Sequence, residues 1–171
     1  MEKPSTARIA LKWGLIISIA NIVYSTIINM SGLWKNSMLG MIGFLILIGG
    51  IVLALREFKT NNNGFMDFGE GFGLGTLMST IVGMLGSAFS LIYTKFIDTT
   101  MMEQIKDFQV EKMEAQGLTD EQIEQALEMG AKFSSPGMVF IIGVIMYLVL
   151  GAIFSLVISA IMRKSKPVFD V

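Results

Sequence analysis

The chain contains no cysteine, no histidine and only three prolines in 171 residues. Without cysteine it can form no disulfide, use no thiolate nucleophile and hold no iron–sulfur cluster. Without histidine it lacks the usual acid or base near neutral pH and the commonest ligand of zinc, copper and haem. These absences exclude much of enzyme chemistry, so we expect a non-enzyme with no catalytic, cofactor-binding or metal-binding residues.

Charged residues are also scarce. They make up 16% of the chain, whereas 53% is hydrophobic and the mean hydropathy is +0.64. Ordinary soluble domains are about 25% charged, so this composition is typical of a protein whose solvent is the lipid bilayer. The net charge of −1 and the small, scattered groups of basic residues argue against a nucleic-acid partner.

The apolar residues are gathered into four long runs. Crossing the hydrocarbon core of a bilayer takes ~20 residues of α-helix, and each run is close to this length. The turn at residues 30–37 is short enough to force the first two helices into an antiparallel pair. We therefore expect an all-α membrane protein, a single domain of residues 1–171 with four transmembrane helices in two hairpins. The expected spans are residues 9–29, 38–55, 72–93 and 137–162.

The polar segment between the third and fourth spans, residues 95–136, holds nine of the fourteen acidic residues. Thr119 and Gln122 have the spacing of a capping box, in which each side chain pairs with the other residue's backbone N–H at a helix start. Gly117 precedes this box and is expected to separate two helices. We predict an acidic, helical insert outside the membrane.

A turn signal at Asn63 and Gly64 follows the second span. Beyond it, Phe65, Phe68 and Phe72 have the spacing that places side chains on one helix face. This pattern predicts a partly helical segment that lies in the membrane interface ahead of the third span.

Lysine and arginine are unevenly divided between the two sides of the expected membrane. The side with both termini and the loop after the second span carries eight of them, and the other side carries five. Because basic residues near span ends favour the cytoplasm, we expect both termini there and residues 95–136 in the periplasm or outside. The eight are Lys3, Arg8, Lys12, Arg56, Lys59, Arg163, Lys164 and Lys166.

Glycine, serine and one asparagine recur about every four positions in three of the expected spans, so they form a stripe along one face of each helix. Membrane helices associate through close van der Waals contact, which small residues allow. We interpret the stripes as helix-packing faces, which predict a compact bundle, a homo-oligomer or contact with another membrane protein. They are Gly14, Ser18, Asn21 and Ser25; Gly75, Ser79, Gly83 and Ser87; and Gly151, Ser155 and Ser159.

No ionisable residue lies in the middle of an expected span. A charge there costs at least about 2.5–3.5 kcal/mol and is retained for a function such as ion coupling. Our first hypothesis is therefore a non-enzymatic interaction or assembly component. The alternative is a small transporter or channel subunit, in which the polar faces of the first and third spans line a path for a neutral solute.

The order of features also carries a family resemblance. A basic first hairpin leads to the run Phe65-Met-Asp-Phe-Gly-Glu-Gly-Phe-Gly-Leu-Gly75, then to Ile92-Tyr-Thr-Lys-Phe-Ile-Asp98, the acidic insert and a last span with a basic tail. This order resembles an uncharacterised domain-of-unknown-function family of small multipass membrane proteins, common in Bacteroidota. The resemblance implies a bacterial inner membrane location and supplies no activity.

Overall fold

The computed structural model describes residues 4–166, and within this range the chain is helical. The only β-type pairing among these residues is an isolated antiparallel bridge between Met66 and Lys164. In chain order the helices are α1 (Thr6–Met30), η1 (Leu33–Lys35), α2 (Ser37–Asn61), α3 (Phe68–Ile92), η2 (Tyr93–Ile97), α4 (Met101–Ala115), α5 (Asp120–Ala131) and α6 (Pro136–Met162).

Residues 4–166 include four helices that are long and apolar enough to cross a membrane. They are α1, α2, the continuous run Phe68–Ile97 made of α3 and η2, and α6. The prediction of an all-helical chain with four candidate membrane spans is confirmed. The helices extend a few residues beyond some of the apolar runs, because polar residues such as Ser5 and Asn36 cap them with side-chain hydrogen bonds.

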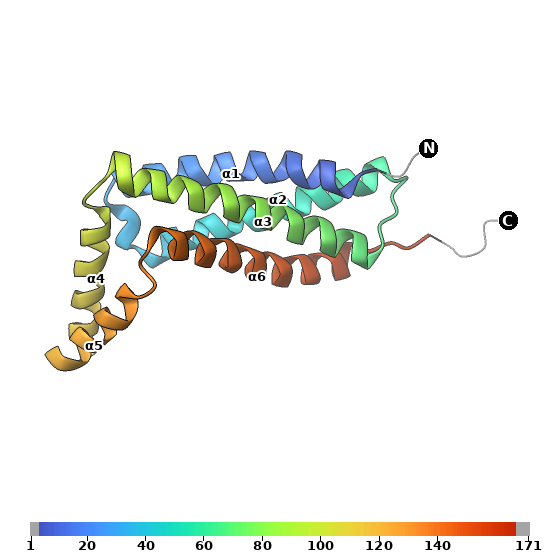
Figure 1. Ribbon diagram of the computed structural model, residues 1–171. Helices are drawn as coiled ribbons and strands as arrows, with labels where there is room; N and C mark the ends of the chain where they lie inside the picture. The colour runs from blue at the N-terminus through green and yellow to red at the C-terminus, as the bar shows by residue number, and fades with distance from the viewer. Residues whose placement is uncertain (1–3, 167–171) are drawn as a thin grey trace. The chain divides into compact units, whose positions relative to one another are not determined.

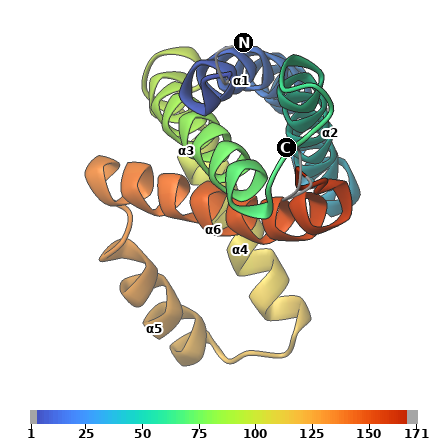
Figure 2. The ribbon, with the colours of Figure 1, turned by 90° about the vertical axis from the view of Figure 1, so that its right-hand side faces the viewer.

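The chain divides into two compact units. Unit 1 holds described residues 4–86 and 144–166, and unit 2 holds residues 87–143. In unit 1, α1, α2 and α3 run alongside one another with the greater part of α6 (Figure 1). Viewed along their length, these helices surround a common centre (Figure 2).

The centre of unit 1 is filled by apolar side chains from α1, α2 and α3. Phe58, Leu47 and Ile51 of α2 are fully buried, and half-buried side chains of α6 pack against this core. In a bilayer, lipid is as apolar as these side chains, so their burial would provide little driving force and close van der Waals contact would hold the helices together. The core residues are Ile9, Ala10, Ile17, Leu47, Ile51, Ala54, Leu55, Phe58, Met66, Leu74, Met78 and Val82.

Large apolar side chains also cover the outward faces of the four long helices. Ile161 and Met38 are 78% exposed, and Leu11 is 61% exposed. In water, each Å² of apolar surface left exposed would forgo about 25 cal/mol of the free energy gained by burial. An apolar exterior of this kind is what a helix surface in contact with lipid requires.

The connection between α2 and α3 leads into the aromatic segment, which is partly helical as predicted. Asn63 and Gly64 adopt left-handed backbone conformations, with φ of 54° and 83°, and turn the chain sharply. Phe65 precedes the helix, whereas Phe68 begins α3 and its ring stacks on Phe72, with ring centroids 6.0 Å apart. The aromatic segment is therefore the first turn of α3 itself.

Unit 2 contains η2, α4 and α5. The chain turns between α4 and α5 at Gly117, whose φ of 80° is a left-handed conformation that favours glycine. Thr119 and Gln122 form the predicted capping box at the start of α5. Met101 and Ile123 supply buried apolar side chains in this unit.

Candidate functional site

The most organised polar feature of unit 1 is the contact between α3 and α6. Gly71 faces Ser159, Gly75 faces Ser155, Ser79 faces Gly151, and Gly83 faces Tyr147. A Cβ atom added at Gly71 would lie 2.7 Å from Ser159 Oγ, and one at Gly83 would lie 2.7 Å from Tyr147 Cβ. Each glycine therefore lets the opposite helix approach more closely than any other residue would allow.

These pairs share one register. Each step of four residues forward along α3 is matched by a step of four residues back along α6, so the two helices run antiparallel with their small residues opposed. Unit 2 contains one further pair in the same register, Ser87 and Gly143. We call this contact the glycine–serine zipper.

The zipper brings together all seven small residues that the sequence stripes place on α3 and α6, and it adds others. Gly71, Gly143 and Tyr147 did not belong to the predicted stripes. Gly71 lies four residues before Gly75, and Gly143 lies eight residues before Gly151. Extending the stripes at the same spacing would therefore have found both.

Hydroxyl groups in the zipper are buried with few conventional partners. Ser79 Oγ donates to the Gly75 carbonyl oxygen at 2.8 Å. Ser155 and Ser159 are fully buried, and their hydroxyls have no hydrogen-bond partner among the described residues. Each faces a glycine, whose Cα–H groups are the weak donors that recur at close helix contacts.

The stripe of α1 faces α2 and α3. A Cβ atom at Gly14 would lie 2.9 Å from Ile81 Cγ2 of α3, and Asn21 Oδ1 lies against Gly43 of α2. Ser18 is buried and donates to the Gly14 carbonyl oxygen at 2.6 Å, and Ser25, which donates to its own helix backbone, is half-buried. Asn21 is 9% exposed, and its Nδ2 has no partner among the described residues.

One end of unit 1 is held by a charged contact between α1 and α2. Lys12 Nζ forms an ion pair with Glu57 Oε2 at 2.8 Å, and Trp13 Nε1 donates to the same oxygen, also at 2.8 Å. The two helices are thereby joined where α1 begins and α2 ends.

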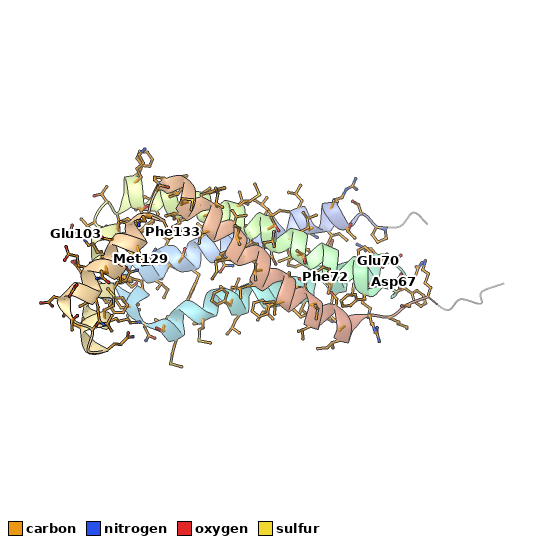
Figure 3. The ribbon with its side chains drawn as sticks, turned by 60° about the horizontal axis from the view of Figure 1, so that its bottom comes forward. Asp67, Glu70, Phe72, Glu103, Met129 and Phe133 are labelled. Atoms are coloured by element: carbon orange, nitrogen blue, oxygen red, sulfur yellow. The ribbon has the colours of Figure 1, made fainter. Side chains whose placement is uncertain are left out.

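The chain that follows α6 is tied to the same end. Lys59 Nζ of α2 donates to the Met162 carbonyl oxygen at 2.8 Å, which places a cation at the last turn of α6. Met66 and Lys164 exchange two backbone hydrogen bonds, of 3.0 Å and 2.9 Å, and Lys164 Nζ lies 5.4 Å from the centre of the Phe65 ring. The start of α3, with Asp67 and Glu70, lies at this end as well (Figure 3).

We call this region the basic end. Its cations come from three parts of the chain: the first turns of α1, the last turns of α2 and the tail that follows α6. Arg8, Arg56, Arg163 and Lys166 are exposed and form no ion pair with another described residue. The basic end is defined by Arg8, Lys12, Arg56, Lys59, Arg163, Lys164 and Lys166; Lys3, the eighth residue of the predicted set, lies outside the described residues.

The helices α4 and α5 of unit 2 carry a surface of the opposite sign. Every acidic side chain on them is exposed. Met102 on α4, Met129 on α5 and Phe133 just after α5 are among the exposed large apolar side chains of this unit. Figure 3 shows Glu103, Met129 and Phe133 on this unit. The acidic residues are Glu103, Asp107, Glu111, Glu114, Asp120, Glu121, Glu124 and Glu128.

Residues 4–166 contain no group of three or more acidic, histidine or cysteine side chains placed to hold a metal ion. Several polar groups of unit 1, such as Lys12, Trp13 and Ser79, instead bind one another or the backbone. This arrangement joins helices and displays charge.

Comparison with known proteins gives a family and no activity. Neither a curated protein nor a solved structure matches the chain. Residues 12–164 match the model of a family described as "Protein of unknown function (DUF4199)". This match spans all four long helices and both units, and it bears out the resemblance to a domain-of-unknown-function family. The chain therefore belongs to the DUF4199 family.

Proposed function

We propose that this chain is a non-enzymatic membrane component that binds another membrane protein through α4 and α5, with its long helices as the anchor. The observation that carries the proposal is a difference between the two units. In unit 1 the small-residue faces of α3 and α6 are opposed to each other, so they hold the chain together. In unit 2 a charged surface with exposed apolar side chains remains uncovered.

The chemistry of this surface indicates the kind of partner. Eight exposed carboxylates lie on α4 and α5, whereas the same helices carry only Lys106 and Lys112 as cations. Met129 is 64% exposed and Phe133 is 53% exposed, so the surface offers apolar anchors among its charges. The complementary partner has basic residues around an apolar patch.

The same charge disfavours self-association through this surface. In a two-fold symmetric dimer each copy presents the same patch, so two acidic surfaces would face each other and repel. We therefore favour a different membrane protein over a second copy of this chain as the partner. We further propose that the chain lies in the bacterial inner membrane. Both termini are then cytoplasmic and residues 95–136 are on the periplasmic or outer side.

The experiment is affinity purification after crosslinking in cells, with a tag at the C-terminus and identification by mass spectrometry and by size. The test variant replaces four carboxylates of unit 2 with glutamine, at Glu111, Glu114, Glu121 and Glu124. All four side chains are exposed, so the fold should persist. The matched control replaces four exposed neutral glutamines or threonines of the same unit with alanine.

We expect a discrete partner protein that co-purifies with the wild type and the control and is lost with the glutamine variant. A partner retained by the glutamine variant would overturn the acidic surface as its binding site. A lone chain without any enriched partner would overturn the interaction function as a whole.

A second candidate function is supported by Asn21. Its amide nitrogen is buried and unpaired, as a group that binds a neutral solute or water would be. If the chain conducts a solute, the face of α1 that carries Asn21 and Ser25 lines the path through the membrane. Flux of small neutral solutes into reconstituted vesicles should then fall with Asn21→Leu, and unchanged flux would exclude the path.

A further inference from the structure

The basic end of unit 1 has no role in the partner binding proposed for unit 2, and its chemistry points to a different ligand. Seven basic residues lie there against three acidic ones, Glu57, Asp67 and Glu70. Glu57 is already paired with Lys12. The other cations therefore leave this end with a net positive charge that the described residues do not neutralise.

We propose that the basic end binds the phosphate groups of anionic phospholipids in the membrane that the bundle spans. Arg56 is in the last turns of α2, and Arg163 directly follows α6. Lys59 of α2 reaches the Met162 carbonyl, so it links these two segments. Arginine binds phosphate with two parallel hydrogen bonds, which makes the exposed Arg56 and Arg163 the principal contacts.

The position of this end along the helices fits the depth of lipid headgroups. Trp13 lies at the end, with its indole nitrogen bonded to Glu57, and Phe65 lies under the Lys164 ammonium. Tryptophan and other aromatic rings collect at the level where hydrocarbon gives way to headgroups, and basic side chains reach from there toward the phosphates. Apolar faces of the long helices continue from this level into the expected hydrocarbon region.

The tail after α6 is held in place before any lipid binds. The two backbone hydrogen bonds between Met66 and Lys164 fix the chain next to the loop that precedes α3. Arg163 lies between this bridge and the end of α6, so its backbone has little freedom to lose on binding. A preorganised site loses less conformational entropy on binding than a mobile basic tail, which attracts anions without a fixed geometry.

The test measures which lipids the protein retains. The full chain is reconstituted into vesicles of equal parts phosphatidylglycerol and phosphatidylcholine, extracted in mild detergent and analysed by native mass spectrometry. The double variant Arg56→Gln with Arg163→Gln is compared with Lys106→Gln plus Lys132→Gln, which removes the same charge from unit 2. All four side chains are exposed.

We expect the wild type and the unit 2 control to retain phosphatidylglycerol in preference to phosphatidylcholine. The arginine double variant should lower this preference about fivefold to twentyfold, because each cation near an anionic surface contributes about fivefold in affinity. The variant with lysine at both positions should restore part of the preference.

Two outcomes would overturn the proposal. One is a wild type that retains the two lipids in the ratio of the vesicles. The other is an equal loss of preference in the arginine variant and the unit 2 control. Thermal unfolding of both variants shows that they are folded, and neither outcome bears on whether α4 and α5 bind a protein partner.

Discussion

Gly75 of α3 lies directly against Ser155 of α6, so closely that a Cβ atom at Gly75 would overlap the serine hydroxyl. Two residues earlier in the same helix, Gly73 is exposed and has no atom within 4 Å of its Cβ position. The two glycines share a helix and differ in what they face. They therefore form a matched pair for testing whether α3 and α6 meet as the structure shows.

The first prediction concerns alanine at these two positions. Gly73→Ala should stabilise the protein by about 0.5–1 kcal/mol, because alanine favours the helix and has open space here. Gly75→Ala should destabilise it by about 1–3 kcal/mol, because the added methyl group must push α6 away. Thermal unfolding in mild detergent measures both, and equal effects at the two positions would contradict the close contact.

A second substitution tests the pairing itself. Ser155→Gly removes the side chain that the new methyl group would meet, so it should rescue Gly75→Ala. The double variant should recover much of the stability lost by Gly75→Ala, with a coupling energy in the range of about 0.5–3 kcal/mol that residues in contact show. Additive effects of the two changes would mean that these positions do not touch.

The ion pair between Lys12 and Glu57 should contribute little to stability. The Lys12 side chain is 53% exposed and that of Glu57 is 26% exposed, so solvent and salt weaken the attraction. Glu57→Gln keeps an acceptor for Trp13 and should lower the free energy of unfolding by about 1 kcal/mol or less. A loss of about 3–5 kcal/mol, as for a broken buried pair, would show that this contact is shielded from solvent.

The bridge between Met66 and Lys164 allows a test with proline. Lys164→Pro removes the N–H that donates to the Met66 carbonyl oxygen at 2.9 Å. Ser165→Pro should be tolerated, because a proline there favours the extended backbone that Lys164 needs in the bridge. Hydrogen exchange at the Met66 amide should become faster with Lys164→Pro alone, and the same rate in both variants would contradict the bridge.

The sequence predicted the elements of this fold well, because their signals are local. Apolar runs gave the four candidate spans, and the spacing of Thr119 and Gln122 gave the start of α5. The aromatic segment was predicted to be partly helical, and α3 begins within it at Phe68. Its non-helical part is short because the tight turn at Asn63 and Gly64 is followed by only residues 65–67 before α3.

The partners of each small-residue stripe could not be read from the sequence. A stripe shows that a helix can be approached closely, and any other stripe of the same kind can satisfy it, within the chain or in another copy. The opposition of Gly75 to Ser155 depends on the register between helices that are far apart in sequence. The bridge at Lys164 and the link from Lys59 to Met162 have no sequence signal either, because the bridge is made by backbone groups and the Lys59 side chain donates to a backbone carbonyl.

The claim that the glycine–serine zipper joins α3 and α6 within one chain can be tested by disulfide crosslinking in native membranes. The chain has no cysteine, so each introduced pair is the only one present. A Cβ atom at Gly71 would lie 3.1 Å from Ser159 Cβ, close to the separation of about 3.5–4.5 Å that a disulfide spans. Gly71→Cys with Ser155→Cys, one step out of register, is the control.

We predict that oxidation of Gly71→Cys with Ser159→Cys gives a crosslink within single chains and little in the control. Either cysteine alone should give no dimer, because both positions are buried against their own chain. Efficient dimer formation by Gly71→Cys alone or Ser159→Cys alone, with no crosslink inside the chain, would place the zipper between copies and contradict the account.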